Sequence, residues 1–270
     1  MYSRQFGSRN LNQPNIFNTS CIVRTIIHAP YSFVIVRAMS DISSLRHPYH
    51  EKEGHFDVNN LHSRNPFKQF EKWFQEARDV EQILEPNAMS VATASKSGVP
   101  SVRIVLMKAF SEERGITFYT NYGSRKAKEL DENPNCSLMF YWEPLRRSVR
   151  IEGRVVKASK SDSEEYFHSR PRDSQISACV SNQSQVIPNR AYLDDKHVKI
   201  QKKVGDDKPI QMPDYWGGYD IKASIFEFWQ GQTNRLHDRI VFRRPLAEEK
   251  INADTTAVGE NGWVIERLSS

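Results

Sequence analysis

The chain has 270 residues, which allows one large domain or two small ones, and 38% of them are hydrophobic, enough for the core of a soluble protein. The formal charge is +5, but residues 1–40 hold four arginines and no acid, which leaves 34 of the 38 basic groups against all 33 acidic groups in residues 41–270. A body so close to neutral argues against a general nucleic-acid binder, and no run of 18 apolar residues is present to span a membrane.

The first 40 residues form a polar tail whose charge comes from arginine alone. This composition fits a mitochondrial targeting segment and equally an N-terminal extension with no targeting function, and both alternatives stay open. Three cysteines, Cys21, Cys136 and Cys179, give neither a disulfide framework nor a CxxC metal pair. They favour a reducing compartment, and we expect a cytoplasmic protein unless the tail directs import into mitochondria.

Ordered structure is predicted to begin with a helix after residue 62. Asn65 can cap this helix, Pro66 suits its first position, and one face carries Phe67, Phe70, Phe74 and Ala77. From Met89 the hydrophobic pattern changes to period two, which predicts strands. The elements predicted next are strands at Met89–Ser95, Pro100–Phe110 and Gly115–Tyr122, then a short helix from Ser124 to about Glu132.

The second half of the chain predicts further strands with two helices between them. Strands are expected at 136–144 and 148–159, and then at 216–231 and 235–244 as a hairpin-like pair, with a last strand at 262–268. One helix starts at a capping box of Ser161 and Glu164 and ends at Pro171; another runs from about Asn189 to Lys203. About eight mostly meandering strands with inserted helices indicate a mainly β fold, an antiparallel barrel with flanking helices.

A candidate anion site lies in the segment NYGSRKAKEL, residues 121–130. Ser124 can cap a helix, yet Arg125 and Lys126 follow in the first turn, where cations oppose the helix dipole. The free N–H groups of a helix start together with two cations suit a phosphate group. Taken alone, a solvated basic turn explains the same residues more simply.

Two other segments contain cations that suit an anionic ligand. In the strand 100–110, Arg103 and Lys108 fall on opposite faces of an apolar pattern, and an anionic ligand competes evenly with an edge strand whose charges reach solvent. Tyr166 and Arg170 share a helical face and Ser174 follows, which offers two hydroxyls and a guanidinium to a phosphate. By itself, ordinary polarity of a helix surface explains that second set better.

The segment EFWQGQTNRLHDRIVFRR, residues 227–244, predicts a row of positive charge. Arg235, His237 and Arg239 alternate, so a strand would place them on one face, and Trp229 upstream can stack on a flat ring. An edge strand kept soluble by charge is the alternative. Gln183 and Ser184 in a polar turn can bond a ligand or merely form that turn. GxGxxG, Walker, HExxH and GxSxG motifs are absent from the sequence, so standard dinucleotide and hydrolase sites lack motif support.

Five motifs in one order give a family resemblance. EPNAM, NYGSRKAKEL, FYWEPL, RPRDSQI and FWQGQTNRLHDR together resemble the pyridoxine (pyridoxamine) 5'-phosphate oxidase family, over about Phe67 to Leu268. The resemblance implies an FMN-binding split β-barrel in residues 63–270, and a homodimer with FMN at the interface. It implies oxidation of pyridoxine 5'-phosphate and pyridoxamine 5'-phosphate to pyridoxal 5'-phosphate, with O2 as acceptor and H2O2 as product. No nucleic acid, membrane or metal is implied.

The resemblance also implies roles for individual residues. Those implied to bind FMN, partly from the second subunit, are Arg103, Ile104, Val105, Leu106, Tyr119, Thr120, Arg125, Lys126, Ser148, Gln183, Ser184, Trp229 and Arg239. Those implied to hold the substrate phosphate are Lys108, Tyr166, Arg170 and Ser174. Arg235 and His237 are implied to contact the pyridine ring as catalytic residues. Arg46 and Tyr49, in a weaker echo at LRHPY, are implied to close over the substrate, so that part of the extension 1–62 covers the active site.

One departure from the family pattern bears on the flavin. Ser148 stands where the family usually has Gln, and the shorter side chain predicts weaker flavin binding or altered reactivity. The alternative function is a non-oxidase flavin protein, such as a flavin reductase-like enzyme on the same barrel. A carrier that holds pyridoxal 5'-phosphate without turnover is a third. A second phosphate site made by Lys108, Tyr166, Arg170 and Ser174 would favour the oxidase.

Overall fold

The computed structural model describes residues 55–205, 208–233 and 235–270. Its strands are β1 (Ala88–Ala94), β2 (Pro100–Leu106), β3 (Ala109–Ser111), β4 (Gly115–Asn121), β5 (Asn135–Trp142), β6 (Arg147–Lys157), β7 (Trp216–Gln230), β8 (Asp238–Arg243), β9 (Thr256–Val258) and β10 (Val264–Arg267). Its helices are α1 (Pro66–Arg78), α2 (Arg125–Glu132), α3 (Lys160–Ser169), α4 (Arg172–Val180) and α5 (Ala191–Val204), with short 3-10 turns η1 (Val58–Asn60) and η2 (Glu143–Leu145). Arg46 and Tyr49 lie outside the described residues.

The strands form one antiparallel sheet in the order β2-β1-β5-β6-β7-β8-β10-β9, with β4 on β7 and β3 on β4. This confirms a mainly antiparallel sheet with several helices. Lys108 N–H donates to Thr117 O at 2.8 Å, which brings the chain after β2 to β4. No ladder pairs β2 with β4 among the described residues, so the sheet is not closed there.

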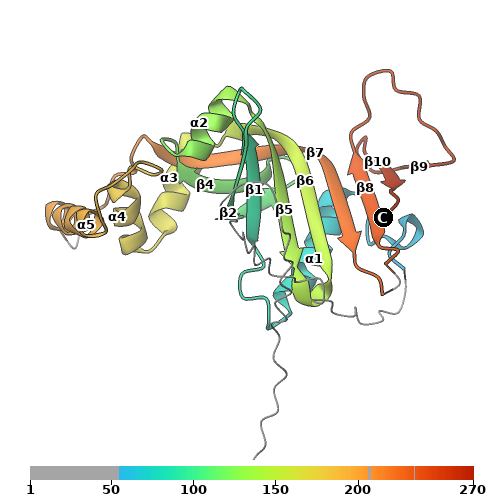
Figure 1. Ribbon diagram of the computed structural model, residues 1–270, viewed down its shortest axis with the longest axis horizontal. Coiled ribbons are helices and arrows are strands. Elements are labelled where there is room, and N and C mark those ends of the chain that lie inside the picture. Colours follow the sequence, from blue (N-terminus) through green and yellow to red (C-terminus); the bar gives the residue numbers. More distant parts are fainter. Residues whose placement is uncertain (1–54, 206–207, 234) are drawn as a thin grey trace, which may run out of the picture. The chain divides into compact units, whose positions relative to one another are not determined.

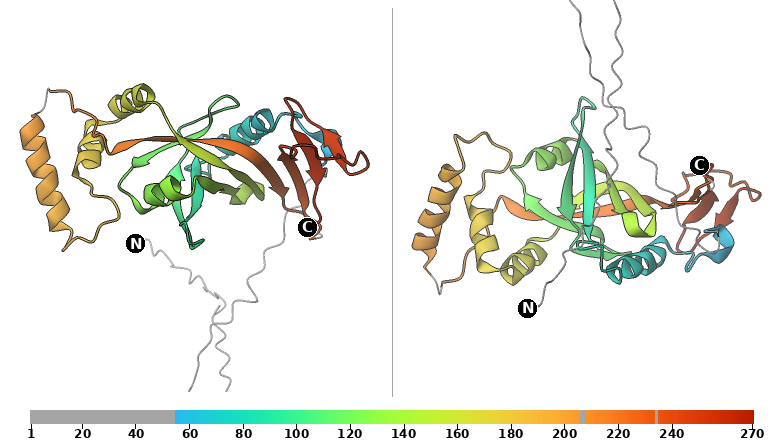
Figure 2. Two further views of the ribbon diagram at one scale, coloured as in Figure 1. Left: turned by 90° about the horizontal axis from the view of Figure 1, so that it is seen from above. Right: turned by 60° about the horizontal axis from the view of Figure 1, so that its bottom comes forward.

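Strand β7 is the longest strand and joins two regions of the sheet. Its first half pairs with β4 and its second half with β8, while β6 runs beside nearly all of it. Figures 1 and 2 show α3, α4 and α5 grouped near the start of β7, and β8, β9 and β10 near its end. At about 3.3 Å per residue, the 13 steps from Trp216 to Trp229 extend roughly 40 Å along the strand.

Helix α1 begins as its sequence predicts. Asn65 Oδ1 accepts the N–H of Phe67 at 2.9 Å, and Pro66 is the first helical residue. Phe67, Phe70 and Ala77 are buried as expected, and Trp73 is buried with them, whereas Phe74 is half-buried. The aromatic face of α1 packs on β5 and β7, and this packing forms the main core.

Three details of the predicted elements are wrong. The expected strand 100–110 is broken at Met107 and Lys108, between β2 and β3. Helix α3 is capped by Ser159, whose Oγ accepts the N–H of Asp162, and not by Ser161. Helix α4 was not expected because its apolar residues are all in its second half; Ile176, Ala178 and Val180 are buried in a second, smaller core with Phe167 and Trp216.

The N-terminal part of the described chain packs on the sheet. The Phe56 ring lies 4.8 Å from the Trp73 ring, and Phe56 N–H donates to the buried Asp238 carboxylate. Leu61 also packs against the main core. Residues 55–62, which the sequence assigns to the extension, are thus in contact with the compact domain.

Candidate functional site: two cavities on one chain

The first cavity, which we call the helix-side cavity, has a volume of about 570 Å³. It lies between the start of β7, the strands β2 and β4, and the helices α2, α3 and α4. Its lining includes Ile104, Val105, Leu106, Lys108, Tyr119, Thr120, Lys126, Tyr166, Arg170, Ser174, Gln183 and Trp216. Eleven of the 17 residues that line it were candidate site residues from the sequence, and they come from separate segments that the fold brings together.

Arg170 is the most informative group in the helix-side cavity. Its Nη1 atom is buried and has no hydrogen-bond partner among the described residues. The guanidinium lies over the Trp216 ring, 4.9 Å from the centroid, and burial lowers the pKa of Arg170, although an arginine stays charged near neutral pH. A buried N–H of a cation without an acceptor is costly, so an anion in this cavity would stabilise it.

Aromatic rings fix the position of Arg170. The Tyr119 and Tyr166 rings stack 4.0 Å apart, and Tyr119 stacks on Trp216 at 5.5 Å. Lys108 Nζ lies 5.8 Å from the Tyr166 centroid, so a second cation borders the same space. Trp216 was missed as a site residue because its strand pattern explained it as core.

Lys126 supplies a further cation to the helix-side cavity. It is only 8% exposed, and Thr120 Oγ1, 3.1 Å from Nζ, is its hydrogen-bond acceptor among the described residues. Burial, followed by the nearby charge of Arg103, lowers the pKa of Lys126 to about 8. An ammonium carries three N–H groups, so room remains for an anionic acceptor.

The start of α2 is capped by Ser124 as expected, and two of its N–H groups have side-chain acceptors within the chain. Ser124 Oγ accepts the N–H of Ala127, and Ser184 Oγ accepts the N–H of Arg125 at 3.1 Å. Gln183 Oε1 accepts from Thr120 Oγ1 at 3.3 Å. The turn that carries Gln183 and Ser184 therefore reaches the same end of α2 within one chain.

Arg103 is held differently from what its position in the sequence suggested. Its guanidinium does not line the cavity: Nη1 donates to Thr93 Oγ1 and Val91 O, and Nη2 donates to Ser101 Oγ and Glu129 Oε2. The carboxylate that accepts from it, Glu129, was also missed by sequence analysis, because a lone acid in a helix is usually a solvated surface residue.

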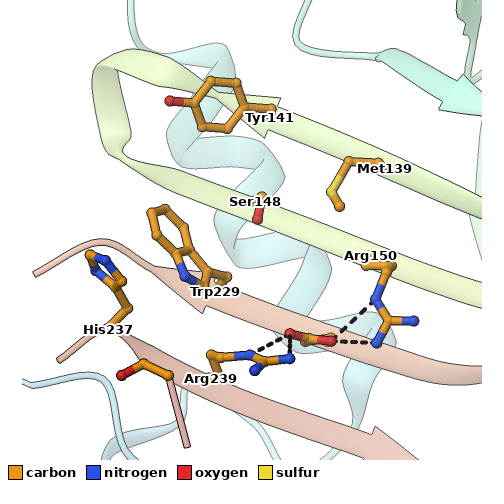
Figure 3. A pocket seen from close by; sticks show the side chains of 9 residues that line it. Met139, Tyr141, Ser148, Arg150, Trp229, His237 and Arg239 are labelled. Atoms are coloured by element: carbon orange, nitrogen blue, oxygen red, sulfur yellow. Dashed lines mark hydrogen bonds and ion pairs between the residues drawn. The ribbon is translucent and has the colours of Figure 1, made fainter. Parts of the chain in front are cut away.

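The second cavity, which we call the strand-side cavity, has a volume of about 450 Å³ and lies on the face of β5, β6, β7 and β8. Its lining is Met139, Tyr141, Ser148, Arg150, Glu227, Trp229, His237, Arg239 and Ser270. Figure 3 shows His237 next to the Trp229 ring, and contacts that join Arg150 and Arg239 through one carboxylate. That carboxylate is Glu227, which sequence analysis missed as well.

Arg235, His237 and Arg239 do not form the expected row on one strand. Strand β8 starts at Asp238, and Arg235 has a left-handed φ of 66°, so only Arg239 is in the strand. Gln232 explains the difference: its N–H donates to His237 Nδ1 at 3.0 Å, and its side chain donates to Asp238, so that residues 231–233 and 235–237 are not part of a strand. His237 and Arg239 still line the same cavity.

The tautomer of His237 follows from this contact. Because Nδ1 accepts a backbone N–H, the proton of the neutral ring is on Nε2. Burial, with the charge of Arg235, lowers the pKa of His237 below its ordinary value, so the ring is neutral near pH 7. Arg239 in turn donates to Glu227 Oε1 at 2.8 Å and to Ser269 O at 2.9 Å.

The two cavities share no lining residue. Trp216 borders the helix-side cavity and Trp229 borders the strand-side cavity, at opposite ends of β7. One chain therefore does not bring Lys108, Arg170 and Lys126 together with Ser148, Trp229 and His237. Within the described residues, no group of His, Cys, Asp and Glu is arranged to hold a metal ion, and no helix is long and apolar enough to cross a membrane.

Family models match most of this chain. The model described as "Pyridoxamine 5'-phosphate oxidase" matches residues 75–203, and the model described as "Pyridoxine 5'-phosphate oxidase C-terminal dimerisation region" matches residues 216–270. A pyridoxine/pyridoxamine 5'-phosphate oxidase of Bombyx mori is 48% identical over 93% of this chain and 98% of its own. A pyridoxine-5'-phosphate oxidase of Bos taurus is 48% identical over 86% of this chain and 88% of its own.

Solved structures share the fold. PhzG from Burkholderia lata, in complex with tetrahydrophenazine-1-carboxylic acid, matches with a TM-score of 0.68 and 24% identity, over 81% of this chain and 98% of that one. A pyridoxamine 5'-phosphate oxidase-related, FMN binding protein from Nostoc punctiforme matches with a TM-score of 0.56 and 13% identity, over 76% and 97%. At these identities the likeness concerns the fold alone.

Proposed function

The chain belongs to the pyridoxine/pyridoxamine 5'-phosphate oxidase family, and we propose that it oxidises pyridoxine 5'-phosphate and pyridoxamine 5'-phosphate to pyridoxal 5'-phosphate. Its proposed cofactor is FMN and its proposed electron acceptor is O2, which is reduced to H2O2. The observation that carries the proposal is the buried, unpartnered Nη1 of Arg170 in a cavity that also holds a second, separate group of cationic and hydroxyl donors.

The substrate phosphate is proposed to bind at the α3/α4 side of the helix-side cavity. Arg170, Lys108, Tyr166 and Ser174 all line it, and together they offer a guanidinium, an ammonium and two hydroxyls. A planar guanidinium held against Trp216 is suited to two parallel hydrogen bonds with a phosphate. A flavin enzyme without a phosphorylated substrate would gain nothing from this second anion site.

The FMN phosphate is proposed to bind at the α2 side of the same cavity. Lys126 lines this part of the cavity, and its buried ammonium fits a doubly charged acceptor. The next residue toward the start of α2, Arg125, donates its N–H to the hydroxyl of Ser184, so both are proposed to border the phosphate. The flavin ring is proposed to lie along Ile104, Val105 and Leu106, which line the cavity. The donors present thus fit FMN without any metal.

When bound, FMN supplies the acceptor for the hydride that leaves C4' of the substrate and passes the electrons to O2, and the amine substrate also releases ammonia. The protein's own contribution is placement. Arg170 and Lys108 hold the phosphate end, which fixes where the ring of the substrate lies. His237, neutral with its proton on Nε2, and Arg235 are proposed to orient the pyridine ring as the catalytic residues.

The residues that hold the substrate phosphate and the residues that orient the pyridine ring can contact one substrate only if they come from two chains. Residues 216–270 match a C-terminal dimerisation region, and they contribute Trp229, His237 and Arg239 to the strand-side cavity. We therefore propose a homodimer in which the strand-side cavity of one chain completes the helix-side cavity of its partner, with FMN at this interface. We also propose that β1, β2, β4, β5, β6 and β7 form the family's split β-barrel, with residues 63–270 as the oxidase domain and part of 1–62 covering the active site.

The test adds pyridoxine 5'-phosphate to FMN-loaded protein in air and measures pyridoxal 5'-phosphate and H2O2. The expected result is equal amounts of both products. Arg170→Met removes the proposed phosphate ligand and is expected to raise KM by about 10- to 150-fold, the equivalent of 1.5–3 kcal/mol for a charge-assisted hydrogen bond. Wild-type protein that binds FMN but forms neither product would favour the reductase-like alternative and overturn the proposal.

A further inference from the structure

The carboxylate of Glu129 occupies an unusual place beside the proposed phosphate site. It lies in α2, one turn after Arg125, and the residue is only 6% exposed. It accepts from Thr93 Oγ1 at 2.5 Å, Arg125 Nε at 2.7 Å and Arg103 Nη2 at 3.2 Å. Three segments, β1, β2 and the start of α2, thus meet at one buried acid.

A carboxylate here should oppose the binding of a phosphate. Like charges repel, and the repulsion is strong where water is excluded. Burial would also raise the pKa of Glu129, but the hydrogen bonds from Thr93, Arg125 and Arg103 lower it instead, so the group is an anion near neutral pH. Its presence needs a reason that outweighs the repulsion.

The charges around Glu129 provide part of that reason. Arg103 and Arg125 both form ion pairs with Glu129, and the charge of Arg103, after burial, lowers the pKa of Lys126. Three cations and one carboxylate leave a net charge of +2. A phosphate monoester carries a charge of about −1.5 to −2 at pH 7. The cluster with Glu129 matches that charge, whereas three cations without it would repel one another in the apo-protein.

Geometry provides the rest. The Arg103 guanidinium is fixed by four acceptors, of which Glu129 is the charged one. Arg125 is otherwise exposed, and its Nε contact with Glu129 directs its side chain along α2 toward the second turn of the helix. A flexible arginine loses side-chain freedom when it binds an anion, and an arginine already held by a carboxylate loses less.

We propose that Glu129 is a positioning residue for the FMN phosphate: it holds the guanidinium groups of Arg103 and Arg125 in place at the first turns of α2, and this fixed arrangement outweighs its own repulsion of the phosphate. The proposal rests on the FMN site proposed above. It concerns the phosphate end of the cofactor alone, because the contacts of Glu129 are with the cations and Thr93 and it does not line the cavity.

The test compares FMN with riboflavin, which has the same ring system and no phosphate. Apo-protein is titrated with each flavin, and binding is measured by quenching of flavin fluorescence. Glu129→Gln is expected to weaken FMN at least tenfold and riboflavin less than twofold. Glu132→Gln, which removes an exposed carboxylate from the same helix, is the matched control and is expected to change neither affinity by more than twofold.

Glu129→Asp separates the effect of moving the carboxylate from the effect of removing its charge, and it replaces Glu129→Gln in the titration if that variant does not fold. It keeps the carboxylate but draws it away from both arginines, so it is expected to weaken FMN selectively as well. Equal losses for FMN and riboflavin, or unchanged or tighter FMN binding in both variants, would overturn the proposal. Wild-type protein that binds neither flavin would instead count against the FMN site itself.

Discussion

At the residue scale, two cations of the helix-side cavity have fewer acceptors than their hydrogens require. Arg170 Nη1 has no hydrogen-bond partner and Lys126 Nζ has one, among the residues that the structure describes. Both are substantially buried, so each destabilises the apo-protein until an anion binds. This cost is typical of binding sites, where a ligand supplies the missing partner.

The charge of Lys126 is expected to make FMN affinity and apo-protein stability depend on pH. Its pKa of about 8 lies below the ordinary 10.5, so the folded apo-protein loses this proton first as the pH rises. FMN affinity is expected to fall by up to about tenfold per pH unit above pH 8, because the phosphate loses a cation. The unfolded chain still binds the proton between these pH values, so apo-protein stability is expected to rise there.

The measurement is FMN titration from pH 7 to 10, with Lys126→Met as the control that lacks the titrating group. The control is expected to bind FMN weakly and with a flatter profile. A wild-type affinity that stays constant through pH 9 would show that Lys126 does not contribute its charge to FMN binding.

Ser148 provides a second prediction at this scale. It lies opposite Trp229 in the β6/β7 register and lines the strand-side cavity, where a longer amide would reach further. Ser148→Gln is expected to tighten FMN binding by about two- to tenfold, the equivalent of one ordinary hydrogen bond. Flavin titration tests this, with Ser148→Ala expected to resemble wild type. No gain in the glutamine variant would contradict the role given to this position.

At the scale of elements, β7 determines where the functional residues lie. Its start carries Trp216 into the helix-side cavity and its end carries Trp229 into the strand-side cavity. The period-two pattern predicted this strand well, because alternate apolar residues must face the core. It could not predict the branching, in which β7 pairs with β4 in its first half and β8 in its second, since the sequence pattern does not specify partners.

The helix starts were predictable where a side chain caps the backbone, as at Asn65 and Ser124. The loop before β8 was not, because it depends on Gln232 reaching both His237 and Asp238, a tertiary contact. Glu129 and Glu227 could not be identified from the sequence for the same reason. Each carboxylate pairs with two arginines, and these come from distant segments or, for Arg125, from the adjacent turn of the same helix. The motif resemblance identified most residues that line the helix-side cavity, because matching a motif does not require knowledge of tertiary contacts.

A substitution at Gly115 tests how closely the start of β4 approaches β7. Its φ is +86°, and a Cβ there would lie 1.9 Å from the Ile221 carbonyl oxygen. Gly115→Ala is expected to lower the free energy of unfolding by about 2 kcal/mol or more, from strain and overpacking together. Gly98→Ala is the control: its φ is +83° but its Cβ would meet nothing within 4 Å, so about 1 kcal/mol is expected. Urea unfolding that gives both variants the same loss would contradict the close approach.

At the scale of the whole molecule, each active site is proposed to require two chains. Substrate and FMN must be in contact for hydride transfer, yet the groups proposed to hold and orient them lie in cavities at opposite ends of β7. A two-fold dimer satisfies both requirements, because each chain offers one helix-side and one strand-side cavity.

Complementation between two impaired variants tests this claim most directly. Arg170→Met disables the helix-side cavity, and Arg235→Ala disables the catalytic loop beside the strand-side cavity. A mixed dimer of the two, purified through different tags, is expected to have one intact site and one site with both defects. With substrate well below the wild-type KM, it should form pyridoxal 5'-phosphate at about half the wild-type rate per dimer, while Arg170→Met alone is slowed about 10- to 150-fold by its raised KM and Arg235→Ala alone is nearly inactive. A mixed dimer no more active than its parents would contradict the shared site.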